Sequence, residues 1–411
     1  MPGQTEATLR AKLVEQLSIA GWIRTDAVAS AFASVARHLF LPGVDPAVAY
    51  ADEAVVTRTG ADGRPLSSSS QPAVMAAMLE QLAVARGHHV LEVGAGTGYN
   101  AALLARLVGD RGAVTSIDID LDLVERARRH LTAAGLPDVT VVCADGADGW
   151  RENAPYDRII VTAGASDLSP VWTEQLAEGG RLVLPLSLRG VQQSVAFDPA
   201  ADHLMSVSVI DCGFMPLRGA LAGRDPIRPL GEHPGLFLRL ERDRAVDTLA
   251  IDNALTHPGD VLPIGVRVTP QEAMRGLALW LALQEPDVGQ LAAVGAAADH
   301  ARVPALIAIP GMTSTMVLVG RSELAALVPH DATGAETSAV AVRAYGPGAD
   351  GLAERLAAHV RQWDAHGRPS TSALHIRAYP HGAAASHAAI TIDMPHTRFL
   401  VDWHQGDRTG S

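Results

Sequence analysis

The amino-acid sequence predicts an α/β protein built on a Rossmann-like, doubly wound parallel sheet, with an N-terminal helical segment before it and a C-terminal α+β domain after it. Three observations lead to this prediction. Short apolar runs alternate with helical patterns between residues 89 and 185, a glycine-rich turn joins the first run to the first helix, and a Gly- and Pro-rich stretch at 219–235 precedes a region of different character. Strands that alternate with helices form parallel sheets with helices on both faces.

Five apolar runs have the length of buried parallel strands. They occupy residues 89–93 (HVLEV), 114–117, 139–143, 158–162 (RIIVT) and 181–185 (RLVLP). The intervening patterns predict helices over residues 98–108, 121–134 and 169–177. Residues 191–217 contain further strand-like runs, which we expect to complete the sheet as antiparallel members.

The first 72 residues are predicted to form a helical segment followed by a loop. Apolar residues recur at three- and four-residue steps over residues 5–38, with a break at Gly21 and Trp22. Residues 51–72 are rich in Gly, Ser and Asp and contain two prolines, which indicates a loop. A helical pattern returns over residues 73–85, where the central domain begins.

We expect the central domain to span residues 73–218 and the C-terminal domain to span residues 219–411. Within the latter, residues 270–284 and 350–364 have helical patterns. Strand-like runs occupy residues 305–310, 315–319, 338–345, 373–379 and 388–394. The mixture predicts an α+β domain.

The composition is that of a globular protein, with 48% hydrophobic and 19% charged residues. The net charge of −12 repels phosphate backbones, so we expect no nucleic-acid partner. The N-terminus lacks the apolar core of a signal peptide and no apolar run reaches about 18 residues, so we expect a cytoplasmic protein without a membrane partner. The two cysteines and 16 histidines lack zinc-type spacing, so no metal site is expected. The sequence does not predict the oligomeric state.

The sharpest motif is the segment 92–98 (EVGAGTG), which follows the first strand and precedes the first helix. Gly94, Gly96 and Gly98 allow a tight turn and a close approach of the main chain to a ligand. Their G-x-G-x-G spacing differs from the G-x-G-x-x-G of dinucleotide-binding proteins. The carboxylate of Glu92 would repel a pyrophosphate but suits an ammonium group, such as that of a methionine moiety, directly or through water.

Two further acidic residues end the second and third strands. Asp118 lies 20 residues after Gly98, where a carboxylate accepts both hydroxyls of a ribose. Asp145, followed by Gly146, is placed to accept from the amino group of an adenine. Ligands of open parallel sheets bind at this carboxyl edge, so the set predicts S-adenosyl-L-methionine as cofactor and a Rossmann-like class I methyltransferase sheet. Taken singly, each feature is often only a turn or a helix cap.

Residues 30–218 resemble the protein-L-isoaspartate (D-aspartate) O-methyltransferases in a chain of short motifs. These are residues 36–42 (ARHLFLP), 49–52 (AYAD), 70–72 (SQP), 90–98, 145–150 (DGADGW), 154–159 (APYDRI), 179–185 and 214–217 (FMPL). The resemblance implies methylation of an aspartyl or isoaspartyl carboxylate in a peptide or protein, and it implies that Ser70 is the active-site residue. Without the resemblance, Ser70 ahead of Pro72 and Ala73 indicates a helix N-cap.

Two departures from the family pattern concern substrate. A short G-x-G-Q-T-I-S stretch is replaced by the longer, more polar residues 58–69 (RTGADGRPLSSS), and residues 219–411 have no expected counterpart in the repair enzyme. In both respects the chain is similar to larger actinobacterial methyltransferases of ribosomal peptide maturation (lanthipeptide, lasso peptide or graspetide systems). Those enzymes methylate an aspartate of a macrocyclised peptide, and the ester closes to an aspartimide. We therefore expect such a substrate, recognised by the C-terminal domain, with general isoaspartate repair as the alternative.

A carboxylate acceptor agrees with the residues present. It is ionised at neutral pH and needs no general base, which fits a site without an obvious His–Asp pair. Catalysis then rests on positioning and on exclusion of water. Ser70 is the candidate donor that orients the carboxylate, with the neighbouring Ser69 and Ser68 as alternatives. The motifs around Ser70 argue against a small-molecule methyltransferase, and the intact acidic set argues against a non-catalytic binding module. The absence of N-P-P-Y and D-P-P-Y motifs argues against DNA methylation.

Overall fold

The structure of the protein is a computed structural model. It describes residues 5–60, 65–223, 227–231, 235–241, 244–299, 303–304, 306–309, 311–331, 337–383 and 388–403. The chain divides into two compact units. Unit 1 comprises residues 1–186, 192–223 and 375–401, and unit 2 comprises residues 187–191, 224–374 and 402–411.

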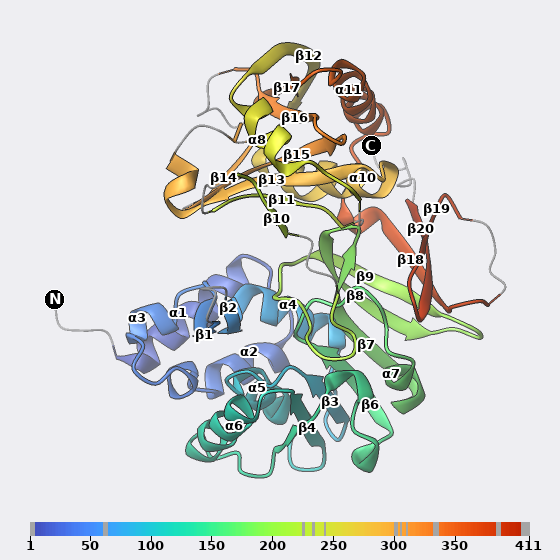
Figure 1. Ribbon diagram of the computed structural model, residues 1–411. Coiled ribbons are helices and arrows are strands. Elements are labelled where there is room, and N and C mark those ends of the chain that lie inside the picture. Colours follow the sequence, from blue (N-terminus) through green and yellow to red (C-terminus); the bar gives the residue numbers. More distant parts are fainter. Residues whose placement is uncertain are drawn as a thin grey trace, which may run out of the picture. The chain divides into compact units, whose positions relative to one another are not determined.

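Unit 1 contains a sheet with the strand order β19-β20-β18-β9-β8-β7-β6-β3-β4-β5 (Figure 1). Its parallel part pairs β3 with β4 and β6, β4 with β5, and β6 with β7. These strands are β3 (His89–Val93), β4 (Ala113–Asp118), β5 (Thr140–Cys143), β6 (Tyr156–Val161) and β7 (Leu176–Leu188). All five match the apolar runs of the sequence, so the Rossmann-like prediction is confirmed.

Antiparallel strands continue the sheet, as expected for residues 191–217. β8 (Val191–Pro199) pairs with β9 (Leu204–Asp211), with Val195 opposite Val209. Both strands follow β7 directly in sequence.

The described residues of unit 1 form seven α-helices, of which six lie close to their predicted positions and one, α3, was not predicted. They are α1 (Glu6–Ile19), α2 (Asp26–Ser34), α3 (Pro46–Ala49), α4 (Pro72–Leu82), α5 (Tyr99–Val108), α6 (Leu121–Ala133) and α7 (Pro170–Gln175). Thr5 and Thr25 cap α1 and α2 by accepting from main-chain N–H groups, which explains where these helices begin. The apolar faces of α1, α2, α4, α5 and α6 share one core with β3 and β4.

The expected loop at residues 51–72 contains a hairpin. β1 (Val55–Thr59) pairs antiparallel with β2 (Pro65–Ser69), and residues 61–64 between them lie outside the described part of the chain. The prediction missed this hairpin because its strands carry more Ser, Thr and Pro than apolar residues, and composition alone is then typical of a loop.

The chain re-enters unit 1 near its C-terminus, which differs from the boundary expected at residue 218. β18 (Leu374–Pro380) pairs with β9 through Arg377 opposite Met205, and β19 (Ile390–Asp393) pairs with β20 (Thr397–Trp403). Residues 375–401 therefore extend the same sheet that carries β3 to β7. Apolar alternation predicts a strand but not the sheet that the strand joins, so the sequence left this pairing unseen.

Unit 2 has its own antiparallel sheet, in the order β10-β11-β13-β15-β16-β17-β12, with β14 pairing β15. The strands are β10 (Ile227–Pro229), β11 (Leu236–Arg239), β12 (Pro258–Val268), β13 (Val288–Val294), β14 (Ile307–Ile309), β15 (Met312–Val319), β16 (Leu324–Pro329) and β17 (Ser338–Tyr345). The helices are α8 (Thr248–Leu255), α9 (Pro270–Glu272), which continues through a π turn into α10 (Ala278–Gln284), and α11 (Asp350–Ala365).

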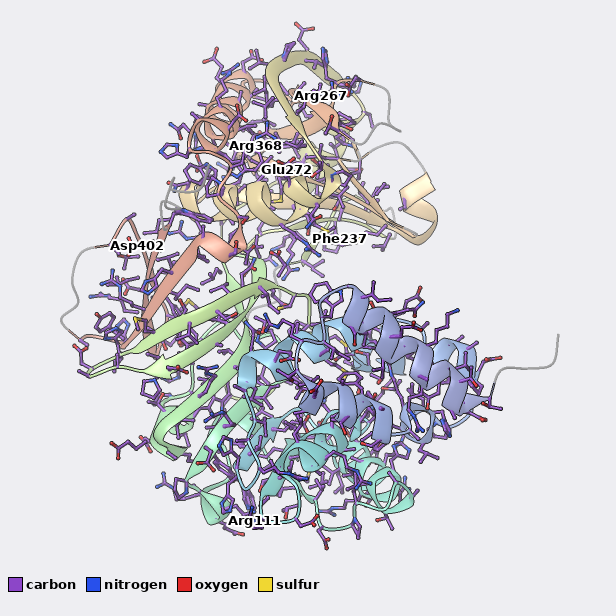
Figure 2. All side chains as sticks on the ribbon, turned by 180° about the vertical axis from the view of Figure 1, so that it is seen from behind. Arg111, Phe237, Arg267, Glu272, Arg368 and Asp402 are labelled. Carbon is purple, nitrogen blue, oxygen red and sulfur yellow. The ribbon has the colours of Figure 1, made fainter. Side chains whose placement is uncertain are left out.

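Alternate residues of this sheet face two apolar cores. One core packs against α10 and α11 and the other against α8. Trp280 and Trp363 are buried in the first core, so both contribute to packing rather than to a surface. Beside them Arg368 donates to Glu272 at 3.0 Å, and the two side chains lie next to each other in Figure 2.

Candidate functional site

The glycine loop lies between β3 and α5, at the carboxyl edge of the parallel strands. The N–H groups of Gly94 and Ala95 donate to the carbonyl oxygen of Ile117 on β4, at 2.7 and 2.9 Å. Gly94 has a φ of +105°, and a Cβ atom there would collide with the hydroxyl of Thr162. Gly98 begins α5 with a φ of +86°. Glycine is therefore required at these two positions.

Glu92 lies beneath this loop with no exposed surface. Its carboxylate accepts from Asn100 Nδ2 at 2.8 Å and from the hydroxyl of Ser116. Burial raises the pKa of Glu92 to about 7. Contact of Glu92 with a cofactor ammonium, directly or through water, stays a prediction. In the structure its carboxylate ties α5 to β4 behind the loop.

Asp118 at the end of β4 is joined to the glycine loop. Its Oδ2 accepts from the N–H of Gly96 at 3.0 Å, and its Oδ1 accepts from the N–H of Asp120 at 3.2 Å. Burial raises the pKa of Asp118, while these main-chain donors and the nearby Arg218 lower it. Asp118, the residue predicted to bind the ribose, is therefore in direct contact with the glycine loop.

Two arginines that the sequence analysis did not single out lie at the same edge. Arg58 of β1 forms an ion pair with Asp120. Arg218 lies 3.7 Å from Asp120 and 3.9 Å from Asp118. Arg58 and Asp120 are 62 positions apart in the chain, and no local pattern links them.

Asp145 follows β5, which neighbours β4. Its Oδ1 accepts from the N–H of Ala147 at 3.0 Å, and its Oδ2 accepts from the N–H of Ala220 at 2.7 Å. Gly219 lies so close to this carboxylate that a Cβ atom there would collide with it, and Gly146 lies equally close to Val93. The residues after β9 therefore pack onto Asp145, a contact that the sequence did not predict.

Ser70 lies between β2 and α4 and is half-buried. The helix N-cap is Gln71, without a side-chain hydrogen bond, so the interpretation of Ser70 as the cap of α4 is wrong. The preceding hairpin approaches the glycine loop, because a Cβ atom at Gly96 would lie 3.8 Å from the carbonyl oxygen of Ser68 and 3.9 Å from the hydroxyl of Ser67. The segment that carries Ser70 therefore leaves the hairpin beside the predicted cofactor loop.

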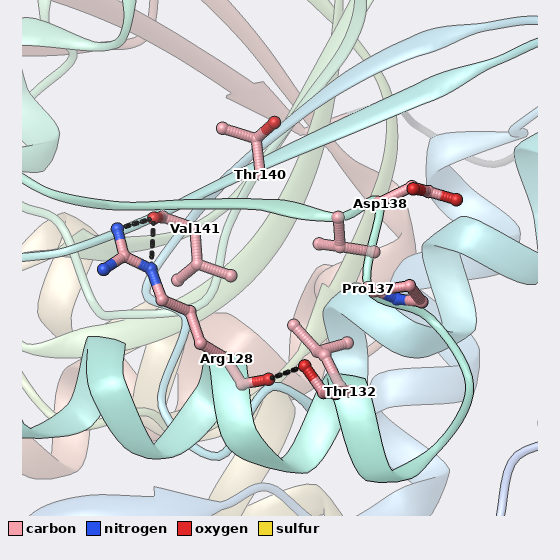
Figure 3. A pocket seen from close by; sticks show the side chains of 8 residues that line it. Arg128, Thr132, Pro137, Asp138, Thr140 and Val141 are labelled. Atoms are coloured by element: carbon pink, nitrogen blue, oxygen red, sulfur yellow. Dashed lines mark hydrogen bonds between the residues drawn. The ribbon is translucent and has the colours of Figure 1, made fainter.

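A cavity of about 440 Å³ lies elsewhere, between α6 and the start of β5 (Figure 3). Figure 3 shows Arg128 donating to the carbonyl oxygen of Val141 through two nitrogen atoms, Nε at 3.1 Å and Nη2 at 2.5 Å. The lining residues 137–141 precede or begin β5, whereas Asp145 follows it. This hollow is therefore at the opposite edge from the acidic set and has no cluster of catalytic groups among its lining residues.

The described residues contain no group of three or more His, Cys, Asp or Glu side chains that could hold a metal ion. No helix in the same part of the chain is long and apolar enough to cross a membrane.

Known proteins are similar to this arrangement and to its sequence. A sequence profile of the family described as protein-L-isoaspartate(D-aspartate) O-methyltransferase matches residues 8–222, just over half of the chain. The Methanopyrus kandleri protein-L-isoaspartate O-methyltransferase is 37% identical over 219 residues, which cover 53% of this chain and 94% of that protein. The chain belongs to the protein-L-isoaspartate O-methyltransferase family. The Thermotoga maritima member is 39% identical over 173 residues, which cover 42% of this chain but only 54% of that protein.

A solved protein-L-isoaspartate O-methyltransferase structure corrects one expectation. It superposes with a TM-score of 0.51 at 22% identity, and the alignment covers 96% of this chain and 99% of that chain. The shared fold therefore extends far beyond residue 223, and the expectation that residues 219–411 have no counterpart in such a protein is wrong.

As a member of this family, the chain is a carboxyl O-methyltransferase that uses S-adenosyl-L-methionine. The residues at the carboxyl edge fit that cofactor. The carboxylates of Asp118 and Asp145 have the chemistry to accept from ribose hydroxyls and from an adenine amino group, and Gly94 and Gly96 carry no side chain that would keep a methionine moiety away from the loop. The segment 92–98 contains no Lys or Arg side chain that could pair with the pyrophosphate of a dinucleotide cofactor.

Proposed function

We propose that the protein methylates isoaspartyl and D-aspartyl carboxylates in proteins and peptides, as a general repair-type enzyme. One observation carries the proposal: the cofactor loop, Asp118 and the segment of Ser70 lie together at one sheet edge, within the residues that match the family. The names of the relatives support the substrate class.

In this proposal the chain's residues act by binding and orientation. S-adenosyl-L-methionine, when bound, supplies an electrophilic methyl group. Asp118 and Asp145 hold its ribose and adenine, and Ser70 donates a hydrogen bond that orients the acceptor carboxylate. The acceptor is already ionised at neutral pH, so no residue is needed to remove a proton. A neutral hydroxyl orients a carboxylate without forming an ion pair that would weaken it as a nucleophile.

The fate of the ester follows from its chemistry. Methanol is a much better leaving group than an oxide, so the neighbouring main-chain nitrogen attacks the ester carbonyl, methanol departs and a succinimide forms. Hydrolysis of that ring returns part of the isoaspartate to aspartate. These steps need no residue of the protein.

A role for unit 2 in substrate recognition is part of the same proposal. Its sheet is covered by helices on both faces, so it is a folded body of its own and not a disordered tail. A dedicated macrocyclic aspartyl peptide remains a second candidate substrate, because the polar hairpin at residues 55–69 still departs from the family pattern. The C-terminal extension no longer favours that candidate, since a solved family protein shares it.

The test is mass spectrometry after incubation with S-adenosyl-L-methionine and two linear peptides of equal composition, one with isoaspartate and one with aspartate. We expect one added methyl group on the isoaspartyl peptide, followed by loss of methanol. A macrocyclised aspartyl peptide, run in parallel, serves as the third substrate. Methylation confined to the macrocycle would contradict the repair proposal and show that the protein is dedicated to a macrocyclic aspartyl peptide.

A further inference from the structure

Arg37 is buried beneath the segment that carries Ser70. It begins the short 3-10 helix Arg37–Phe40, and its side chain has no exposed surface. Among the residues that the structure describes, no carboxylate lies within ion-pair distance of its guanidinium. Burial lowers the pKa of Arg37, while the nearby Tyr99, Asp52 and Tyr50 raise it.

Oxygen atoms around the active-site segment accept from Nη1 and Nη2 of the guanidinium instead, whereas its buried Nε has no hydrogen-bond partner among the described residues. Arg37 Nη2 donates to the carbonyl oxygen of Ser70 at 3.0 Å and to the hydroxyl of Ser69 at 3.4 Å. It also reaches the carbonyl oxygen of Glu53 at 3.3 Å, before β1. The ring of Tyr99, at the start of α5, lies 5.7 Å from the guanidinium carbon. A single side chain thus joins both ends of the hairpin to the helix that follows the cofactor loop.

Asp52 holds the same segment through its donors. Its Oδ1 accepts from the N–H of Ala73 at 2.8 Å, and its Oδ2 accepts from Gln71 Nε2 at 3.1 Å. Asp52 therefore caps α4 while Arg37 takes up the carbonyl oxygen of Ser70. The two residues fix the main chain on both sides of Ser70.

A buried cation on its own is poor evidence for a role in protein stability. Even a buried ion pair can often be replaced by apolar residues of similar volume without loss of stability, so the burial of a charge does not by itself indicate a stabilising role. The planar fork of arginine can bind several fixed oxygen atoms at once, whereas lysine presents a compact charge that cannot. The arrangement is therefore suited to holding geometry.

We propose that Arg37 is a positioning residue for methyl transfer, which sets the direction of the Ser70 hydroxyl by holding the carbonyl oxygen of Ser70 and the hydroxyl of Ser69. This inference rests on the proposed function, in which Ser70 orients the acceptor carboxylate. Arg37 acts through Ser70 and touches neither substrate nor cofactor. Its effect should therefore fall on kcat and vanish when the Ser70 hydroxyl is absent.

The experiment measures kcat and KM for an isoaspartyl peptide, with the Kd of S-adenosylhomocysteine, in Arg37→Lys, Arg37→Met, Ser70→Ala and the double variant Arg37→Lys/Ser70→Ala. We expect kcat to fall by about tenfold in both Arg37 variants, no further than in Ser70→Ala, with the Kd changed less than threefold. The double variant should be no slower than Ser70→Ala. The matched control is Arg158→Met, because Arg158 donates to the carbonyl oxygen of Leu82 at the other end of α4; its kcat should change less than threefold.

Three results would overturn the inference: a folded Arg37→Met or Arg37→Lys variant with wild-type kcat, a loss of cofactor affinity that parallels the loss of kcat, or additive effects in the double variant. Arg37→Lys keeps the charge and serves if Arg37→Met does not fold. Amide hydrogen exchange of residues 69–73 in Arg37→Lys provides a readout without turnover. If the wild type does not methylate isoaspartyl peptides, the proposed function fails. Exchange that is at least tenfold faster in Arg37→Lys, and only at residues 69–73, would still support the role of Arg37 in holding this segment. Unchanged exchange would refute that role.

Discussion

Glu92→Gln should change how the stability of unit 1 depends on pH. The Glu92 carboxyl has an ordinary pKa of 4.5 in the unfolded chain and about 7 in the folded protein, because burial disfavours the charged form. Between these values the unfolded chain has released a proton that the folded protein keeps. The free energy of unfolding therefore falls as pH rises from 4.5 to 7, by about 3 kcal/mol in total. Glutamine does not titrate, so the variant lacks this decline.

The assay is the unfolding free energy of β3 and β4, measured from amide hydrogen exchange against denaturant concentration at several pH values. The variant should gain on the wild type as pH rises toward 7 and gain nothing further above about 8. Glu125→Gln, which removes one exposed carboxylate of α6, is the control and should follow the wild-type curve. Wild-type and Glu92→Gln curves that run parallel from pH 5 to 8 would refute the reasoning, because Glu92 would then be ionised in the folded protein.

Three further predictions concern the cofactor and the acceptor. Asp118→Ala should weaken S-adenosylhomocysteine binding about 100-fold in calorimetry, because two charge-assisted hydrogen bonds to the ribose are lost; unchanged affinity would discredit the site. Ser70→Ala should lower kcat about tenfold with cofactor affinity retained, as expected for one neutral hydrogen bond, and full activity would remove Ser70 from the mechanism. Arg218→Gln should raise the pKa of Asp118, because Arg218 lowers it in the wild type. When the solution is acidified, the variant should therefore lose cofactor affinity at a higher pH than the wild type does. Superimposable pH profiles would show that Arg218 does not act on Asp118.

The sequence predicted those parts of the fold that are written in continuous apolar runs. The runs of β3 and β6 are buried strands at or close to the expected residues, since a parallel strand between two helical layers needs apolar side chains on both faces. In unit 2, β12 begins with exposed residues and alternates only over its last part, so half of that strand carries no apolar signal. The hairpin of β1 and β2 was missed for the same reason.

The candidate site was predictable only where its residues lie close together in one segment of the sequence. The glycine loop and Asp118 have fixed spacing within one strand–helix–strand unit, so a sequence pattern describes them. The contact of Arg37 with Ser70 spans 33 positions and that of Arg58 with Asp120 spans 62, and each depends on how the hairpin packs. The burial of Glu92 was also invisible, because an acidic residue in a motif gives no sign of whether it faces a ligand or the core.

The position of residues 375–401 decides how the role of unit 2 can be assigned. A chain that ends near Leu217 would lose β18, β19 and β20 and leave β9 as an unpaired edge, with Met205 and Val207 already exposed on it. Such an edge favours aggregation, so loss of activity in that truncation would report damage to the methyltransferase sheet and not lost recognition. A deletion of residues 224–373 that keeps the last three strands leaves unit 1 complete. Cofactor binding retained with peptide methylation lost would then assign recognition to unit 2, whereas full methylation would show that unit 1 recognises its substrate alone.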